Sequence, residues 1–120
     1  MQAEIWTTRE GVPRLTDNMA GYNVETRDGR FGTVDRVSYA GDRLFVSTGR
    51  VKKRRYVIPV GAVERIDNDS RSILVAVTTQ EIEQSPRNDL QRGFDEEMER
   101  KTAEYYAPLL SLGLGGTDDV

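Results

Sequence analysis

The segment 21–89 constrains the fold of this chain most, because short apolar runs alternate there with turn residues at close intervals. The runs occupy residues 22–27, 30–39, 43–48, 56–60, 63–67 and 72–77. An apolar period of two is typical of strands, whose successive side chains point to opposite faces of a sheet. Runs joined by tight turns, without a long crossover, favour an antiparallel barrel over alternating strands and helices. We therefore predict a mainly β fold, a small antiparallel barrel of about six strands.

Glycine and proline positions refine this prediction. Asp28-Gly29 separates the first two runs and indicates a hairpin, since a type I′ turn needs positive φ at both central residues. Gly32 lies inside the second run and predicts a bulge or a close approach of two backbones. Pro59 cannot donate to a neighbouring strand, so we expect its strand at a sheet edge or a bulge.

The N-terminal arm, residues 1–18, contains the apolar pair Ile5-Trp6, which could add an edge strand before Gly11 and Pro13 break it. Two interpretations of Trp6 stay open. It covers an open end of the sheet, or it is an anchor that faces a partner. The barrel domain itself is assigned to residues 19–89.

Helical signals follow the last strand. Thr78 and Glu81 fit a capping box, which predicts a short helix before Pro86. A second helix is predicted over 90–110, ending or kinking at Pro108, with a disordered tail at 111–120. Its apolar stripe packs on its own barrel, on a twin subunit or on another protein. The stripe consists of Leu90, Phe94, Met98, Tyr105 and Leu109.

Composition excludes several chemistries. The 120 residues include no Cys and no His, which removes disulfides, thiolate metal sites and the commonest general base near neutral pH. Any catalysis would have to use carboxylates, Lys, Tyr or a borrowed cofactor, and an enzyme that uses Asp or Glu stays a third hypothesis. No catalytic constellation is visible, so we expect no catalytic residues, no metal and no cofactor. The net charge of −3 gives no overall attraction to nucleic acid. There is neither a long apolar run nor a signal-peptide core, so we expect a cytoplasmic protein without membrane insertion.

A basic loop stands out in this acidic chain, with five cations in residues 50–55. Three interpretations remain open: a solvated loop that discourages edge pairing, a contact with an anionic protein surface, and a contact with nucleic acid. Tyr56 beside it offers a single stacking surface. The cations are Arg50, Lys52, Lys53, Arg54 and Arg55.

The spaced glycines and valines also resemble a known family. The matching positions are Gly21, Asp28-Gly29, Gly32-Thr33-Val34, Ile58-Pro59, Val63, Ile66-Asp67, Val75 and Pro86. In this order they resemble a PRC-barrel domain of the small stand-alone bacterial type. Its relatives include the cytoplasmic part of the photosynthetic reaction-centre H subunit and the C-terminal domain of RimM-type ribosome maturation factors. The resemblance implies an all-β barrel that docks to proteins or ribonucleoprotein and has no family-wide active site.

From these features we expect a non-enzymatic adaptor that docks a protein partner, as a homodimer. The alternative is an RNA- or ribosome-associated factor that binds through residues 50–55. The residues expected to contact a partner are Trp6, Arg50, Lys52, Lys53, Arg54, Arg55, Phe94, Met98, Tyr105 and Leu109.

Overall fold

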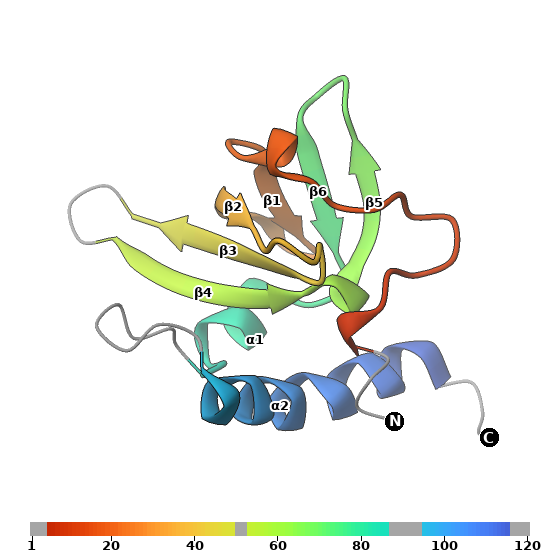
Figure 1. Ribbon diagram of the computed structural model, residues 1–120, viewed down its shortest axis with the longest axis vertical. Helices are drawn as coiled ribbons and strands as arrows, with labels where there is room; N and C mark the ends of the chain where they lie inside the picture. The colour runs from red at the N-terminus through yellow and green to blue at the C-terminus, as the bar shows by residue number, and fades with distance from the viewer. Residues whose placement is uncertain (1–4, 50–52, 87–94, 116–120) are drawn as a thin grey trace.

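The computed structural model describes residues 5–49, 53–86 and 95–115. Within these residues the chain forms a six-stranded sheet with the order β4-β3-β2-β1-β6-β5 (Figure 1). The strands are β1 Asn23–Thr26, β2 Gly29–Val37, β3 Arg43–Thr48, β4 Arg54–Pro59, β5 Val63–Asp67 and β6 Ser72–Val75. Each strand overlaps a run that the sequence predicts, so the mainly β class is confirmed. β4 starts at Arg54, so Arg54 and Arg55 lie in a strand and not in the predicted basic loop.

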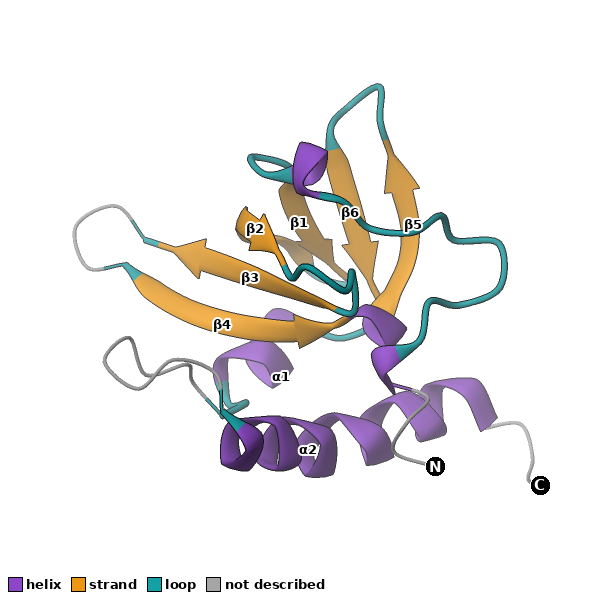
Figure 2. Ribbon diagram, in the orientation of Figure 1, coloured by secondary structure: helices purple, strands orange, loops and turns teal. Residues whose placement is uncertain are grey.

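Helical elements connect and flank the strands of the sheet. Two short 3-10 helices are η2 Asp17–Met19 and η3 Val60–Ala62, and two α-helices are α1 Thr79–Glu83 and α2 Glu96–Gly115. Figure 2 shows α1 and the long α2 stacked beneath β4, on the side away from the β5–β6 hairpin. The helices therefore cover one side of the molecule.

The predicted closed antiparallel barrel is wrong in two respects. β1 pairs with β6 in parallel, with Val24 opposite Ile73, while the other strand pairs are antiparallel. The sheet is also not closed, since β4 and β5 are its two edge strands among the described residues. A parallel pair needs a long connection, and here residues 27–71 supply it. The sheet is thus mixed, and strongly curved.

Turn geometry corrects one further prediction. The first hairpin forms, but Thr26 pairs with Gly29, so its turn residues are Arg27 and Asp28. Asp28 is not among the residues with positive φ, which rules out the predicted type I′ turn. The predictions for Gly32 and Pro59 are confirmed. A Cβ on Gly32 would lie 2.4 Å from the Ser47 carbonyl oxygen, and Pro59 ends an edge strand.

The core lies on the inner face of the curved sheet. Alternate residues of the strands meet there, among them Val24, Val34, Val46 and Ile73, all at most 1% exposed. The helices complete the same cluster with Ile82, Ala103, Tyr106 and Leu110. Burying an apolar side chain of the size of Ile82 or Leu110 contributes about 1.5–3 kcal/mol, so the attached helices add to the stability of the sheet.

The helix bounds differ partly from the sequence prediction. The capping box is confirmed, because Thr78 Oγ1 accepts from the Glu81 amide and the Glu81 carboxylate accepts from the Thr78 amide. α2 continues through Pro108 to Gly115, so neither the predicted end at Pro108 nor a disordered start of the tail at residue 111 is correct. Pro108 is exposed, where the carbonyl that loses its partner can be hydrated. Residues 116–120 lie outside the described residues.

The N-terminal arm also differs from its prediction. Ile5 and Trp6 lie in a 3-10 turn and not in an edge strand. Ile5 is buried in the core cluster, and Trp6 packs against this cluster and lies beside α2. The predicted edge strand is therefore wrong: this apolar pair contributes its side chains to the core and does not pair with a strand through its backbone.

Candidate functional site

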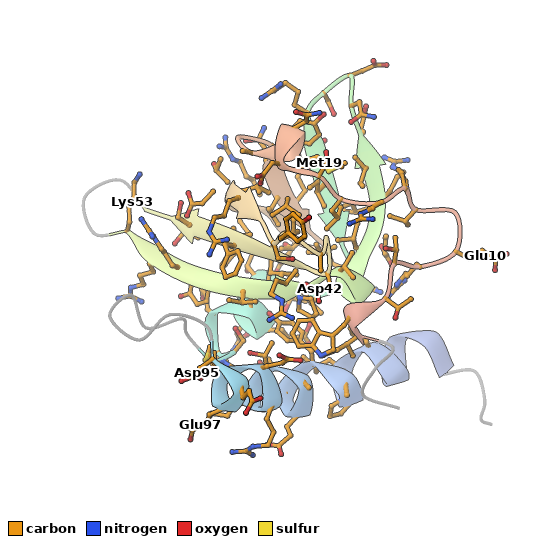
Figure 3. The ribbon with its side chains drawn as sticks, viewed as in Figure 1. Glu10, Met19, Asp42, Lys53, Asp95 and Glu97 are labelled. Atoms are coloured by element: carbon orange, nitrogen blue, oxygen red, sulfur yellow. The ribbon has the colours of Figure 1, made fainter. Side chains whose placement is uncertain are left out.

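The structure brings four exposed cations to one end of the β2–β4 sheet. Arg54 and Arg55 begin β4, Lys53 directly precedes it, and Arg30 belongs to β2. These four residues are called the basic surface below. Figure 3 shows Lys53 just before the start of β4, pointing away from the body of the molecule. The other predicted cations, Arg50 and Lys52, lie outside the described residues. Lys53 and Arg54 make no ion pair with any described residue, whereas Arg55 Nε lies 3.8 Å from Asp35 Oδ2.

A groove of about 500 Å³ adjoins the basic surface between the ends of β2 and β3. Arg30 and Lys53 lie at it, and Phe31, Asp35 and Ser47 contribute further side chains. Asp35 Oδ1 accepts a hydrogen bond of 2.9 Å from Ser47 Oγ, which fixes the carboxylate. The sequence did not predict this groove, because its residues come from separate strands.

The predicted stripe on α2 is directed largely to its own chain. Tyr105 and Leu109 pack against the core, and Tyr105 Oη donates a 2.7 Å hydrogen bond to the Glu81 carbonyl oxygen. Met98 is half-buried, and Leu90 and Phe94 lie outside the described residues. Of the three interpretations left open, contact with its own barrel therefore holds for Tyr105 and Leu109.

The most buried face of α2 was missed. Thr102, Ala103, Tyr106 and Leu110 are each at most 4% exposed. Thr and Ala carry little hydrophobic signal, so a search for large apolar residues selected Tyr105 and Leu109, which are partly buried beside this face, and missed the fully buried residues. The hydroxyl of Thr102 donates to the Met98 carbonyl oxygen at 2.7 Å, which allows burial. A search for non-charged residues at three- and four-residue spacing, regardless of their size, would have identified this face.

Trp6 joins the arm, the barrel and α2. The guanidinium of Arg43 lies 4.5 Å from the centre of the Trp6 ring. Arg43 donates to both carboxylate oxygens of Asp42, at 2.9 and 3.1 Å, and lies 3.8 Å from Glu99 on α2. The hydrogen bond from Arg43 lowers the pKa of the Asp42 carboxyl. The arrangement favours the covering role for Trp6 over the partner-facing one.

Other ionisable groups are held by local structure. The Thr26 hydroxyl lowers the pKa of Asp28, and the Ser70 amide lowers the pKa of Asp67. A carboxylate kept ionised in this way serves a turn and is a poor proton donor near neutral pH. The described residues contain no group of three or more acidic side chains placed to hold a metal ion. In the same part of the chain, no helix combines the length and the apolarity needed to cross a lipid bilayer.

Comparison with solved structures gives a distant likeness. No protein-family model and no curated protein matches the sequence. One similar solved structure is a crystal structure assigned as the 16S ribosomal RNA processing protein RimM of Pseudomonas aeruginosa, with 18% identity and a TM-score of 0.43. The match covers 62% of this chain and 50% of that chain, so the chain spans about half the length of that protein. A likeness this distant transfers no function.

Proposed function

We propose that this chain is a non-enzymatic, PRC-barrel-like adaptor that docks an acidic protein partner through the basic surface. The observation that carries the proposal is the group of consecutive exposed cations, of which Lys53 and Arg54 have no ion-pair partner among the described residues. Complementary charge speeds association and selects against wrong partners. The apolar side chains Tyr105 and Leu109 serve the core, which leaves charge as the main feature for docking.

The non-enzymatic part of the proposal is supported by the environment of the carboxylates. Asp28, Asp42 and Asp67 have lowered pKa values caused by hydrogen bonds within turns or to a neighbouring arginine. General acids need the opposite shift. None of the three is thus prepared for proton transfer near neutral pH.

The test is a tagged pull-down from source lysate, with and without nuclease. The variant Arg54→Gln/Arg55→Gln removes two cations from the basic surface. A matched control, Arg14→Gln/Arg65→Gln, removes two exposed cations elsewhere and leaves the net charge the same in both variants. We expect a nuclease-resistant protein to co-purify with the wild type and the control, and to be lost in the first variant. Equal recovery in all three proteins would contradict the role of the basic surface.

A second candidate function is RNA binding by the same surface, favoured by the density of its cations. It predicts that recovery of the partner is lost on nuclease treatment. The binding constant would also fall steeply with salt concentration. On logarithmic axes the slope of this dependence would become shallower by about one for each phosphate contact removed.

Dimerisation stays a prediction from the sequence. The stripe on which it depended is used within the chain at Tyr105 and Leu109. Light scattering over a range of concentrations tests it, and a concentration-independent monomer would contradict it.

A further inference from the structure

We propose that the groove between β2 and β3 binds a nucleotide, with the base on Phe31 and the phosphate between Arg30 and Lys53. The shared chemistry is a planar base joined to a phosphate, supplied by a free nucleotide or by one unit of a single strand. The groove volume of about 500 Å³ lies within the usual range for small-ligand sites. This inference goes beyond protein docking, because Phe31 and Asp35 take no part in docking. Arg30 and Lys53 belong to both sites, so the two proposals are separated by Phe31 and Asp35 on one side and by Arg54 and Arg55 on the other.

Two β-bulges direct side chains into the groove. The register of β2 against β1 passes from Gly32 to Arg30 and leaves Phe31 as an extra residue. Its register against β3 passes from Val34 to Arg36 and leaves Asp35 as another. Both extra residues line the same groove. Bulges re-aim side chains and are frequent beside functional sites, so this pair within one strand distinguishes the groove from an ordinary surface depression.

Phe31 provides a fixed aromatic surface. Its ring centroid lies 5.3 Å from that of Tyr56, at an interplanar angle of 64°. The edge contact holds the Phe31 ring on the buried Tyr56, while part of the ring stays exposed at the groove. An aromatic ring held in this way can stack on any nucleobase.

The charged groups are arranged for the two ends of a nucleotide. Arg30 Nη2 lies 3.5 Å from Thr33 Oγ1, which places the guanidinium beside the groove, and Lys53 lies at the groove on β4's side. These cations suit a phosphate. Asp35 is held by Ser47 and offers an acceptor to the exocyclic amine of adenine, guanine or cytosine. Uracil has no exocyclic amine, so we expect the site to prefer adenine, guanine or cytosine over uracil, and adenine is the probe used below.

A nucleotide fits these groups better than an acidic peptide does. A peptide carboxylate would also meet the cations, but an acidic side chain has no planar ring to stack on Phe31. A nucleotide brings its hydrogen-bond donor to Asp35 and its negative charge to Arg30 and Lys53. Charge and shape thus select the same class of ligand.

The experiment uses the full chain with three probes: AMP, UMP and fluorescein-labelled single-stranded decaadenylate. Calorimetry measures the mononucleotides and fluorescence anisotropy measures the oligonucleotide. We expect Phe31→Leu, which keeps an apolar side chain against Tyr56, to weaken binding of AMP or of the oligonucleotide about tenfold. Lys53→Gln should also weaken binding and reduce its salt dependence. Arg65→Gln, an exposed cation on β5, is the matched control and should bind as the wild type does.

The outcomes separate the sources of the ligand. Binding of AMP identifies a free nucleotide, and binding of decaadenylate alone identifies a single strand. The proposal is overturned if neither AMP nor decaadenylate binds. It is also overturned if folded Phe31→Leu binds either probe as tightly as the wild type does. Should Phe31→Leu fail to fold, Asp35→Asn decides, because the proposal requires it to reduce the preference for AMP over UMP. Protein docking that depends on Arg54 and Arg55 would survive failure of the nucleotide site.

Discussion

The hydroxyl of Tyr106 gives the sharpest test of the packing described above. The side chain is 0% exposed, and within the described part of the chain its oxygen has no hydrogen-bond partner with suitable geometry. A buried hydroxyl without a partner costs about 1–3 kcal/mol. Tyr106→Phe keeps the ring and its edge contact with Tyr105, at 5.3 Å between centroids. We therefore expect the free energy of unfolding to rise by about 1 kcal/mol and the Tm by about 4 °C.

The same substitution should change the response to alkali. Burial raises the pKa of the Tyr106 phenol far above its ordinary value of 10.0. The folded state therefore keeps the proton while the unfolded state loses it near pH 10, so this contribution is complete below pH 10 and declines above it. At pH 11, one unit above the ordinary pKa, ionisation of one tyrosine stabilises the unfolded state by about 1.4 kcal/mol. Partial burial also raises the pKa of Tyr105, but that residue is present in both proteins.

The assay is urea unfolding followed by circular dichroism at pH 7, 9 and 11. The loss of stability between pH 9 and pH 11 should be smaller by about 1.4 kcal/mol in Tyr106→Phe than in the wild type. Tyr39→Phe is the matched control, because Tyr39 is fully exposed and should show neither effect. If Tyr106→Phe is less stable at pH 7, the hydroxyl has a partner, for which nearby Ser85 is the first candidate. An unchanged alkaline loss would refute the reasoning about ionisation.

Two further predictions concern the close backbone approach and the arginine cluster. Gly32→Ala should lower the free energy of unfolding by about 2 kcal/mol or more, since a Cβ would meet the backbone oxygen of Ser47 at 2.4 Å, and an unchanged urea midpoint would contradict this. The lowered pKa of Asp42 gives a contribution that is present above its ordinary value of 3.8 and is lost as the pH falls through the folded value. Arg43→Met removes the cause of that shift and should move acid unfolding to higher pH, followed by the fluorescence of Trp6, the sole tryptophan.

Local chemistry made much of the fold predictable from the sequence. Three features depend on residues near in sequence or on the freedom of the backbone. They are the capping box of Thr78 and Glu81, the hairpin near Asp28 and the close backbone approach at Gly32. Each was expected in nearly the right place. The first turn was displaced by one residue because Asp28 does not adopt positive φ, and its carboxylate accepts from the Thr26 hydroxyl and the Thr79 amide.

Long-range pairing was not predictable in the same way. Nothing in the alternation of β1 or β6 indicates which strand lies beside it or in which direction, so the parallel pair was missed. The groove was missed for a related reason, since Phe31 and Asp35 face it through two bulges whose register is set by neighbouring strands. The buried face of α2 was missed because Thr102 and Ala103 are small. The basic surface was identified because charge clusters are visible in sequence.

The parallel pairing of β1 with β6 has a consequence for how the chain acquires its structure. Strands β1 to β4 can form consecutive hairpins as they leave the ribosome, but one side of β1 stays without a partner until β6 has been synthesised. Until then β1 presents an unpaired edge of the kind that recruits other chains. Closing this gap requires contacts distant in sequence, which slows folding. A nascent chain stalled before Ser72 would therefore be the species of this protein most prone to aggregate and most dependent on chaperones.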